Sequence, residues 1–121
     1  TIITAGLCVW ESILASDALK KEGISARVVN MHTVKPIDKE MIQKCASETG
    51  CIVTAEDHQK HGGLSGWVCE VLAQYNPAPV EIVAVNDTFG ESGKGPELFD
   101  KYGISSRHIV DAVKRVLKRG K

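Results

Sequence analysis

Short apolar runs alternate with longer amphipathic segments along the chain. The short runs are rich in β-branched residues, as is typical of strands, and they cover 1–7, 25–31, 51–57 and 80–85. The longer segments repeat apolar residues at helical spacing, and they cover 9–23, 35–50, 62–75, 96–103 and 105–119. Residues 86–95 combine glycine with polar residues, which predicts a loop.

The helical segments carry recognisable ends and apolar positions. Asp38 is expected to cap the second helix and Ser105 the last one, while Gly23 and Gly50 mark the ends of the first two. The apolar positions at helical spacing are Trp10, Ile13, Leu14 and Ala18 in the first helix, Met41, Ile42 and Cys45 in the second, and Leu64, Trp67, Val68, Val71 and Leu72, expected to point inward, in the third.

The order of these elements predicts the fold class. Strict alternation of strand and helix indicates βαβ units and a parallel sheet, with helices on both faces because the crossovers are right-handed. The strands are nearly continuous apolar runs, as expected when both faces are covered. We therefore predict a single α/β domain over 1–121, with three α/β/α layers and a mainly parallel four-stranded sheet in the order 2-1-3-4.

Composition and charge narrow the function classes. Fifteen basic and fifteen acidic side chains cancel, so no global positive field would gather nucleic acid or an anionic membrane surface. No apolar run is long enough to cross a bilayer. The four cysteines are irregularly spaced, which favours free thiols in a reducing cytoplasm over disulfides or a zinc site.

The densest chemistry follows the third strand. Parallel sheets bind ligands beyond the carboxyl ends of their strands, and "EDHQKHGG" lies there. His58 and His61 are three residues apart on a predicted loop, whereas a helical zinc pair is four apart. Glu56 and Asp57, as neighbours on a strand, should point to opposite faces. A polar turn, with solvent-accessible and metal-free histidines, is favoured over a metal site.

Phosphate binding and nucleophilic catalysis are two further possibilities at the same edge. Gly62 and Gly63 open a helix, and its free N–H groups suit an anion, but "HGGLSG" and "GESGKG" both depart from the nucleotide motifs. The alternative is a glycine pair that allows close packing or a positive φ. Neither Ser65 nor Ser92 has the G-x-S-x-G setting. The residues therefore predict no catalytic, cofactor-binding or metal-binding set.

Three segments in this order, "RVVNMHTVKPID", "EDHQKHGG" and "FGESGK…ELFDKYGI", resemble the carboxyl-terminal domain of transketolase from residue 1 to about 117. The resemblance implies part of a thiamine-diphosphate enzyme that moves a two-carbon ketol unit between sugar phosphates. It implies that thiamine diphosphate and Mg²⁺ bind in two other domains of a homodimer, and that this third domain is inactive alone. It also implies that an antiparallel edge strand precedes Thr1, in agreement with a chain that starts inside a strand-like run.

Several alternatives remain open. The same domain type occurs in 1-deoxyxylulose-5-phosphate synthase and in the β subunits of 2-oxo-acid dehydrogenases. A stand-alone module that binds a phosphorylated metabolite at Gly62, Gly63 and Lys94 is another class. A domain for assembly only is a third, and an exposed apolar patch on a helix would favour it. In either of the last two cases the functional edge is expected to comprise His58, His61, Gly62, Gly63, Ser92 and Lys94.

Overall fold

The computed structural model describes the backbone of residues 1–31, 37–59, 63–85 and 95–120, and their side chains except those of 58, 59 and 95–97. Four strands and five helices follow one another in these residues. They are β1 (Ile2–Thr4), α1 (Cys8–Lys21), β2 (Val28–Asn30), α2 (Lys39–Thr49), β3 (Ile52–Gln59), α3 (Leu64–Tyr75), β4 (Val80–Val85), α4 (Gly95–Lys101) and α5 (Ser106–Arg119). The predicted strand-helix alternation is confirmed.

The four described strands form one sheet in the order β2-β1-β3-β4, and all three strand pairs are parallel. Ile3 of β1, for example, lies opposite Val29 of β2 and Thr54 of β3. Because β1 and β3 are central, their residues are covered on both faces, and Ile2, Ile3 and Thr4 are all fully buried. The predicted strand order is confirmed.

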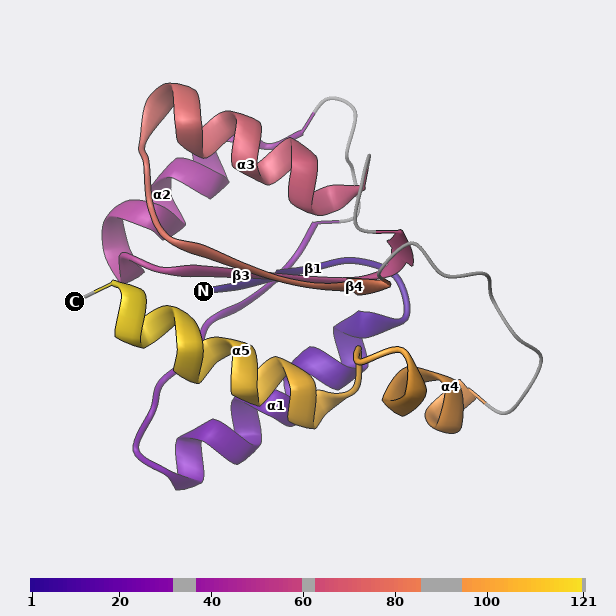
Figure 1. The fold of residues 1–121 in the computed structure, drawn as a ribbon. Helices are drawn as coiled ribbons and strands as arrows, with labels where there is room; N and C mark the ends of the chain where they lie inside the picture. Colours follow the sequence, from indigo (N-terminus) through magenta and orange to yellow (C-terminus); the bar gives the residue numbers. More distant parts are fainter. Residues whose placement is uncertain (32–36, 60–62, 86–94, 121) are drawn as a thin grey trace.

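Helices cover both faces of the sheet, which gives the predicted three layers (Figure 1). The side chains of β1 and β3 alternate between two cores. Ile2 and Val53 point toward α1 and α5, whereas Ile3 and Ile52 point toward α2 and α3. The short helix α4 lies at the end of the molecule toward which β3 and β4 run (Figure 1). The carboxyl edge of the sheet is therefore bordered by the starts of α1 and α3.

Local capping fixes the ends of α2. The Oδ1 atom of Asp38 accepts a hydrogen bond from the Met41 amide at 3.0 Å, which satisfies one of the free N–H groups of the first turn. Gly50 ends the helix with a φ of 78°, a left-handed conformation that glycine adopts without strain. Both predicted ends are confirmed, and Ile42 and Cys45 are buried as the helical spacing indicated.

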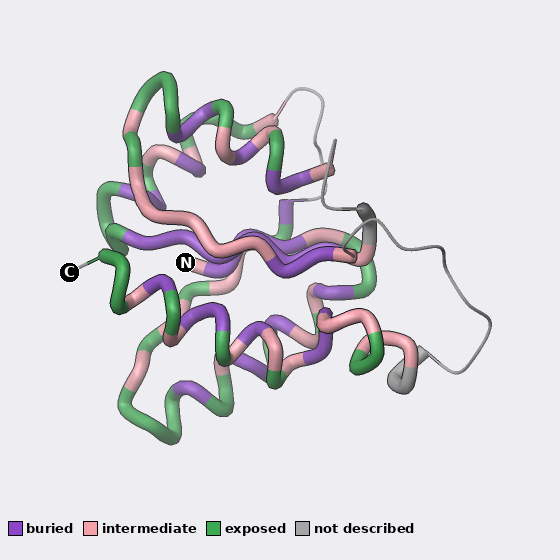
Figure 2. Tube along the Cα trace, viewed as in Figure 1, coloured by how far each residue is buried: buried purple, intermediate pink, exposed green. Residues whose placement is uncertain are grey.

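Helix α1 has an unusual distribution of side-chain sizes. Its buried residues include the small Cys8, Ser12 and Ala15, and Figure 2 shows buried and exposed stretches alternating along this helix. Small residues on the inner side bring the α1 backbone close to the sheet and to α5. The stripe of Trp10, Ile13, Leu14 and Ala18 identified the helix correctly, but all four side chains are exposed.

Candidate functional site

The structure describes only part of the edge that the sequence singled out. His58 lies within β3, since this strand continues to Gln59, and not in the predicted loop. Its side chain is outside the described residues, as are His61, Gly62, Ser92 and Lys94 entirely. Gly63 is the residue before α3, and its backbone is extended (φ −100°), so a positive φ is not what requires glycine there.

The carboxylate of Glu56 lies at the start of α3. Its side chain is fully buried, and Oε2 accepts a hydrogen bond from the Ser65 amide at 3.0 Å. The amino end of a helix attracts negative charge through its free N–H groups and its dipole. At α3 the group held by this attraction is the Glu56 carboxylate. A phosphate approaching Gly63 would therefore meet a negative charge already in place.

Asp57 lies at the start of α1 on the opposite face of the sheet. Gly6, with a φ of 64°, leads from β1 into α1, and a Cβ atom at this position would lie 2.6 Å from Asp57 Oδ1. A side chain at this position would therefore strain the backbone and would require the Asp57 carboxylate to shift. Burial raises the pKa of the Cys8 thiol to about 12, and the carboxylates of Asp57 and Glu11 act on this pKa in the same direction. Cys8 is a neutral, inert thiol.

The two neighbouring carboxylates thus lie beside the starts of different helices, on the opposite faces that their alternation along β3 predicted. Because Glu56 binds at α3 and Asp57 lies beside Gly6 before α1, they do not converge on one ion. In the part of the chain that the structure describes, no group of three or more His, Cys, Asp or Glu side chains could hold a metal ion. The described residues of this edge therefore do not fit a resident metal.

The carboxylate of Glu11, on α1, caps α5. The Oε1 atom of Glu11 accepts a hydrogen bond from the Ser106 amide at 2.9 Å, although 95 residues separate them in the chain. Ser105 is the residue before α5, as predicted, but its side chain makes no capping hydrogen bond. The predicted cap is thus correct in position and wrong in its chemistry, because a carboxylate on α1 has taken over that role.

The hydroxyl of Ser105 belongs instead to a serine–histidine–aspartate group. Ser105 Oγ lies 2.8 Å from His108 Nδ1 and 3.3 Å from Asp100 Oδ1, and Arg107 Nε donates to the same Oδ1 at 2.6 Å. In a catalytic triad the carboxylate orients the histidine, whereas here Asp100 accepts hydrogen bonds from the serine and the arginine. This group therefore joins α4 to α5, and it lacks the arrangement that activates a serine nucleophile.

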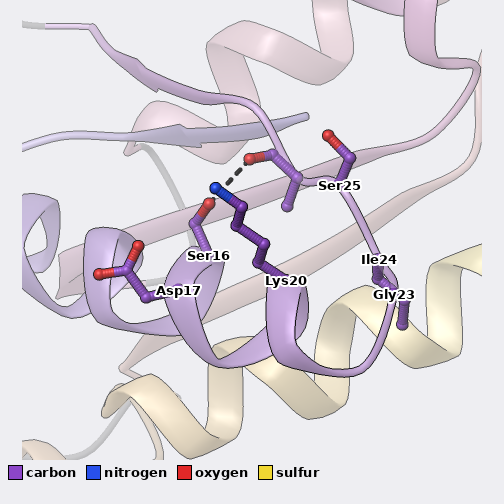
Figure 3. A pocket seen from close by; sticks show the side chains of 7 residues that line it. Ser16, Asp17, Lys20, Gly23, Ile24 and Ser25 are labelled. Atoms are coloured by element: carbon purple, nitrogen blue, oxygen red, sulfur yellow. Dashed lines mark hydrogen bonds between the residues drawn. The ribbon is translucent and has the colours of Figure 1, made fainter.

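Two hollows in the described residues lie away from the carboxyl edge. One of about 510 Å³ is open to solvent and lies between the end of α1 and the segment before β2, with Asp17 and Lys20 at its border (Figure 3). Its inner polar group is already used, because Ser16 Oγ donates to the Ala26 carbonyl at 2.9 Å. A shallow hollow with charges of both signs does not define a ligand.

The most distinctive surface of the described residues is apolar. Leu7, Trp10, Ile13 and Leu14, here named the α1 apolar face, are 64%, 62%, 39% and 37% exposed. Leu7 is the residue before α1 and the other three lie in its first two turns, next to the carboxyl edge. The sequence carried a signal for this surface in its helical spacing, but spacing alone does not say whether such a stripe points inward or outward. In the described part of the chain, no helix has the length and apolar character needed to span a membrane.

Comparison with known proteins finds one matching family model and several similar proteins. The family model described as "Transketolase, C-terminal domain" matches residues 1–109. The 6-deoxy-6-sulfo-D-fructose transketolase subunit SqwH of Clostridium sp. (strain MSTE9) is 41% identical over 98% of this chain and 37% of its own length. An apulose-4-phosphate transketolase subunit of Phocaeicola vulgatus is 40% identical over 98% of this chain and 38% of its own length.

A solved structure agrees with these relatives. The protein described as "Split gene transketolase, inactive beta4 tetramer" superposes with a TM-score of 0.95 at 43% sequence identity, over 99% of this chain and 39% of that one. The chain thus spans about two fifths of the length of each of these three proteins.

Proposed function

Because the chain belongs to the family of transketolase C-terminal domains, we propose that it is the C-terminal domain of an enzyme that transfers a two-carbon ketol unit between sugar phosphates. In this proposal the domain is structural and is inactive alone. The observation that carries it is the pair Glu56 and Asp57, whose carboxylates lie at two different helix starts and not around a common ligand.

The rest of the parent enzyme supplies the chemistry in this proposal. Thiamine diphosphate and Mg²⁺ bind in the other domains, the parent assembles as a homodimer, and the enzyme is cytoplasmic. The free state of Cys8, Cys45, Cys51 and Cys69 supports a reducing compartment. The names of the relatives support transketolase over 1-deoxyxylulose-5-phosphate synthase or the β subunit of a 2-oxo-acid dehydrogenase.

A stand-alone module for phosphorylated metabolites has less support. Its anion would lie at the start of α3, where Glu56 Oε2 already accepts the Ser65 amide proton. A second negative charge at that place would repel the carboxylate at short range. Calorimetric titration of the chain with sugar phosphates is expected to show no binding at millimolar concentration. Saturable binding would favour the module.

The proposed function is tested by a ketol-transfer assay with thiamine diphosphate and Mg²⁺ present. The parent polypeptide that carries residues 1–121 is expected to transfer the ketol unit from a ketose phosphate to an aldose phosphate, and the 121-residue chain alone is not. The donors should include 6-deoxy-6-sulfofructose, because the name of one relative specifies it. A parent that is inactive with every donor, or a chain that is active alone, would contradict the proposal.

A further inference from the structure

From Cys8 to Ala15, the sizes of the side chains on α1 are reversed relative to a helix that only covers a core, whereas farther along the helix the large Leu19 is buried. Cys8, Ser12 and Ala15 face inward and are fully buried, while Leu7 and Trp10 face outward and are more than 60% exposed. Single exposed apolar residues are common on any protein. A tryptophan and three aliphatic side chains within two turns form a contiguous patch, and such patches mark interaction sites.

The polar residues of α1 confine this patch to one end of the helix. Asp17 and Lys21 continue the outward side in the third and fourth turns, with only the small apolar Ala18 between them, so the large apolar side chains end at Leu14. The first two turns follow Gly6, which lies just beyond the end of β1 at Thr4. The patch therefore belongs to the carboxyl-edge end of the domain, and an occupant would contact that end of the molecule.

The size of the patch favours a tethered occupant over a free one. Stable complexes between separate proteins bury about 800 Å² on each partner, contributed by some 20–30 residues. Four side chains on two helical turns are too few for this. Contacts between domains of one chain are held together by the linker, which keeps the local concentration in the millimolar range, so a smaller apolar contact suffices.

The relatives indicate which tethered segment is available. In both transketolase subunits and in the solved split-gene protein, the matched region is 37–39% of one polypeptide, so roughly three fifths of the same chain lies outside it. We propose that the α1 apolar face, Leu7, Trp10, Ile13 and Leu14, docks onto an apolar surface in that remaining part of its own polypeptide. This inference rests on the proposed function, since it requires a longer transketolase chain.

A photocrosslinking experiment on the parent polypeptide tests the docking. The photoreactive residue p-benzoylphenylalanine replaces Trp10 in one protein and Gln74 in a control protein, because Gln74 is exposed on α3 in the opposite layer. Before irradiation, ¹⁵N-labelled and unlabelled protein are mixed, unfolded together and refolded. Mass spectrometry of the crosslinked peptides then reports both the partner residue and whether it belongs to the same chain.

The expected result is crosslinks from position 10 to residues outside 1–121, in pairs with one isotope only, and at a yield several times that of position 74. Isotopically mixed pairs would show that the occupant is another copy and would overturn the inference. Equal yields at positions 10 and 74 would show an open surface and would also overturn it. The ketol-transfer assay of the unmodified parent is read separately, so crosslinking without activity refutes only the proposed function, and activity without crosslinking refutes only the docking.

Discussion

Glu56 and Asp57 are neighbours in β3, yet their carboxylates serve helices in different layers. The alternation of side chains along a strand predicts the opposite directions. It does not predict the targets, because the position of the Ser65 amide depends on how α3 crosses the sheet. The sequence therefore indicated that only one of these acids could readily join a shared site, and the structure adds that each one is beside a helix start.

Replacing the buried Glu56 tests its role at α3. Glu56→Ala is expected to lower the free energy of unfolding by about 1–3 kcal/mol, since the Ser65 amide loses its buried acceptor. Glu56→Gln should cost less, because its side-chain oxygen can still accept. Urea unfolding measures both, with Glu70→Ala as the control at an exposed position of α3. If Glu56→Ala and the control have the same midpoint, Glu56 does not stabilise the helix start.

Gly6 provides a second test at the scale of one residue. Both Gly6 and Gly23 have a positive φ, which costs about 1–2 kcal/mol for a residue with a Cβ atom. At Gly6 the added atom would also lie 2.6 Å from Asp57 Oδ1, whereas at Gly23 nothing lies within 4 Å. Gly6→Ala should therefore destabilise the chain more than Gly23→Ala in thermal unfolding. Equal shifts in Tm would mean that the Asp57 side chain moves away freely.

At the scale of one helix, α1 shows what hydrophobic spacing predicts and what it does not. The spacing of Trp10, Ile13 and Leu14 predicted a helix, and α1 is present. These three side chains are nevertheless exposed, because close packing against the sheet selects small residues such as Ser12 and Ala15 for the inner side. The size of a side chain therefore does not indicate which side of this helix faces the core.

A pair of substitutions in α1 measures this difference. Leu19 is fully buried, so Leu19→Ala is expected to lower the free energy of unfolding by about 2–5 kcal/mol. Trp10 is 62% exposed, so Trp10→Ala should change the same quantity by about 0.5 kcal/mol in the chain alone. Denaturant titration compares them. A larger loss for Trp10→Ala would place this side chain in the core and would contradict the α1 apolar face.

The contact between β4 and α5 should depend on pH. A hydrogen bond from Arg115 Nε to Glu81 at 2.8 Å, opposed by partial burial and helped by Arg119, lowers the pKa of Glu81 below its ordinary value. A carboxyl whose pKa is lowered by folding stabilises the folded state above its unfolded pKa of about 4.3, and this contribution is lost as the pH falls through the lower folded pKa.

The substitution Glu81→Gln tests this dependence. The wild-type chain is expected to exceed Glu81→Gln in stability at pH 7 by about 1 kcal/mol or less, because the partners are largely exposed. The difference should shrink as the pH falls below the ordinary range of a glutamate. Urea unfolding at a series of pH values between neutral and acidic measures it. A difference that is constant with pH would contradict the assignment.

At the scale of the whole molecule, the layered fold was predictable and the docking surface was not. Strand-helix alternation together with right-handed crossovers leaves few topologies, and the order β2-β1-β3-β4 is one of them. No such rule predicts the α1 apolar face, because its role depends on what lies outside the domain. The predicted edge at His58, His61, Gly62, Ser92 and Lys94 remains a prediction, because it lies outside the described side chains.

The exposed α1 apolar face should also determine how the 121-residue chain behaves alone. Without its occupant, the face around Trp10 is expected to cause weak association at high protein concentration, because apolar surface is removed from water although the patch is too small for a stable complex. Trp10→Lys places a charge there and should shift the chain toward monomer, while Gln74→Lys adds the same charge on α3 and should not. Light scattering over a range of concentrations measures both variants. Because Trp10 is largely exposed, Trp10→Lys should change the association and leave the unfolding midpoint unchanged, which would show that the surface acts independently of the stability of the fold. Equal effects of the two lysines would mean that net charge alone controls association.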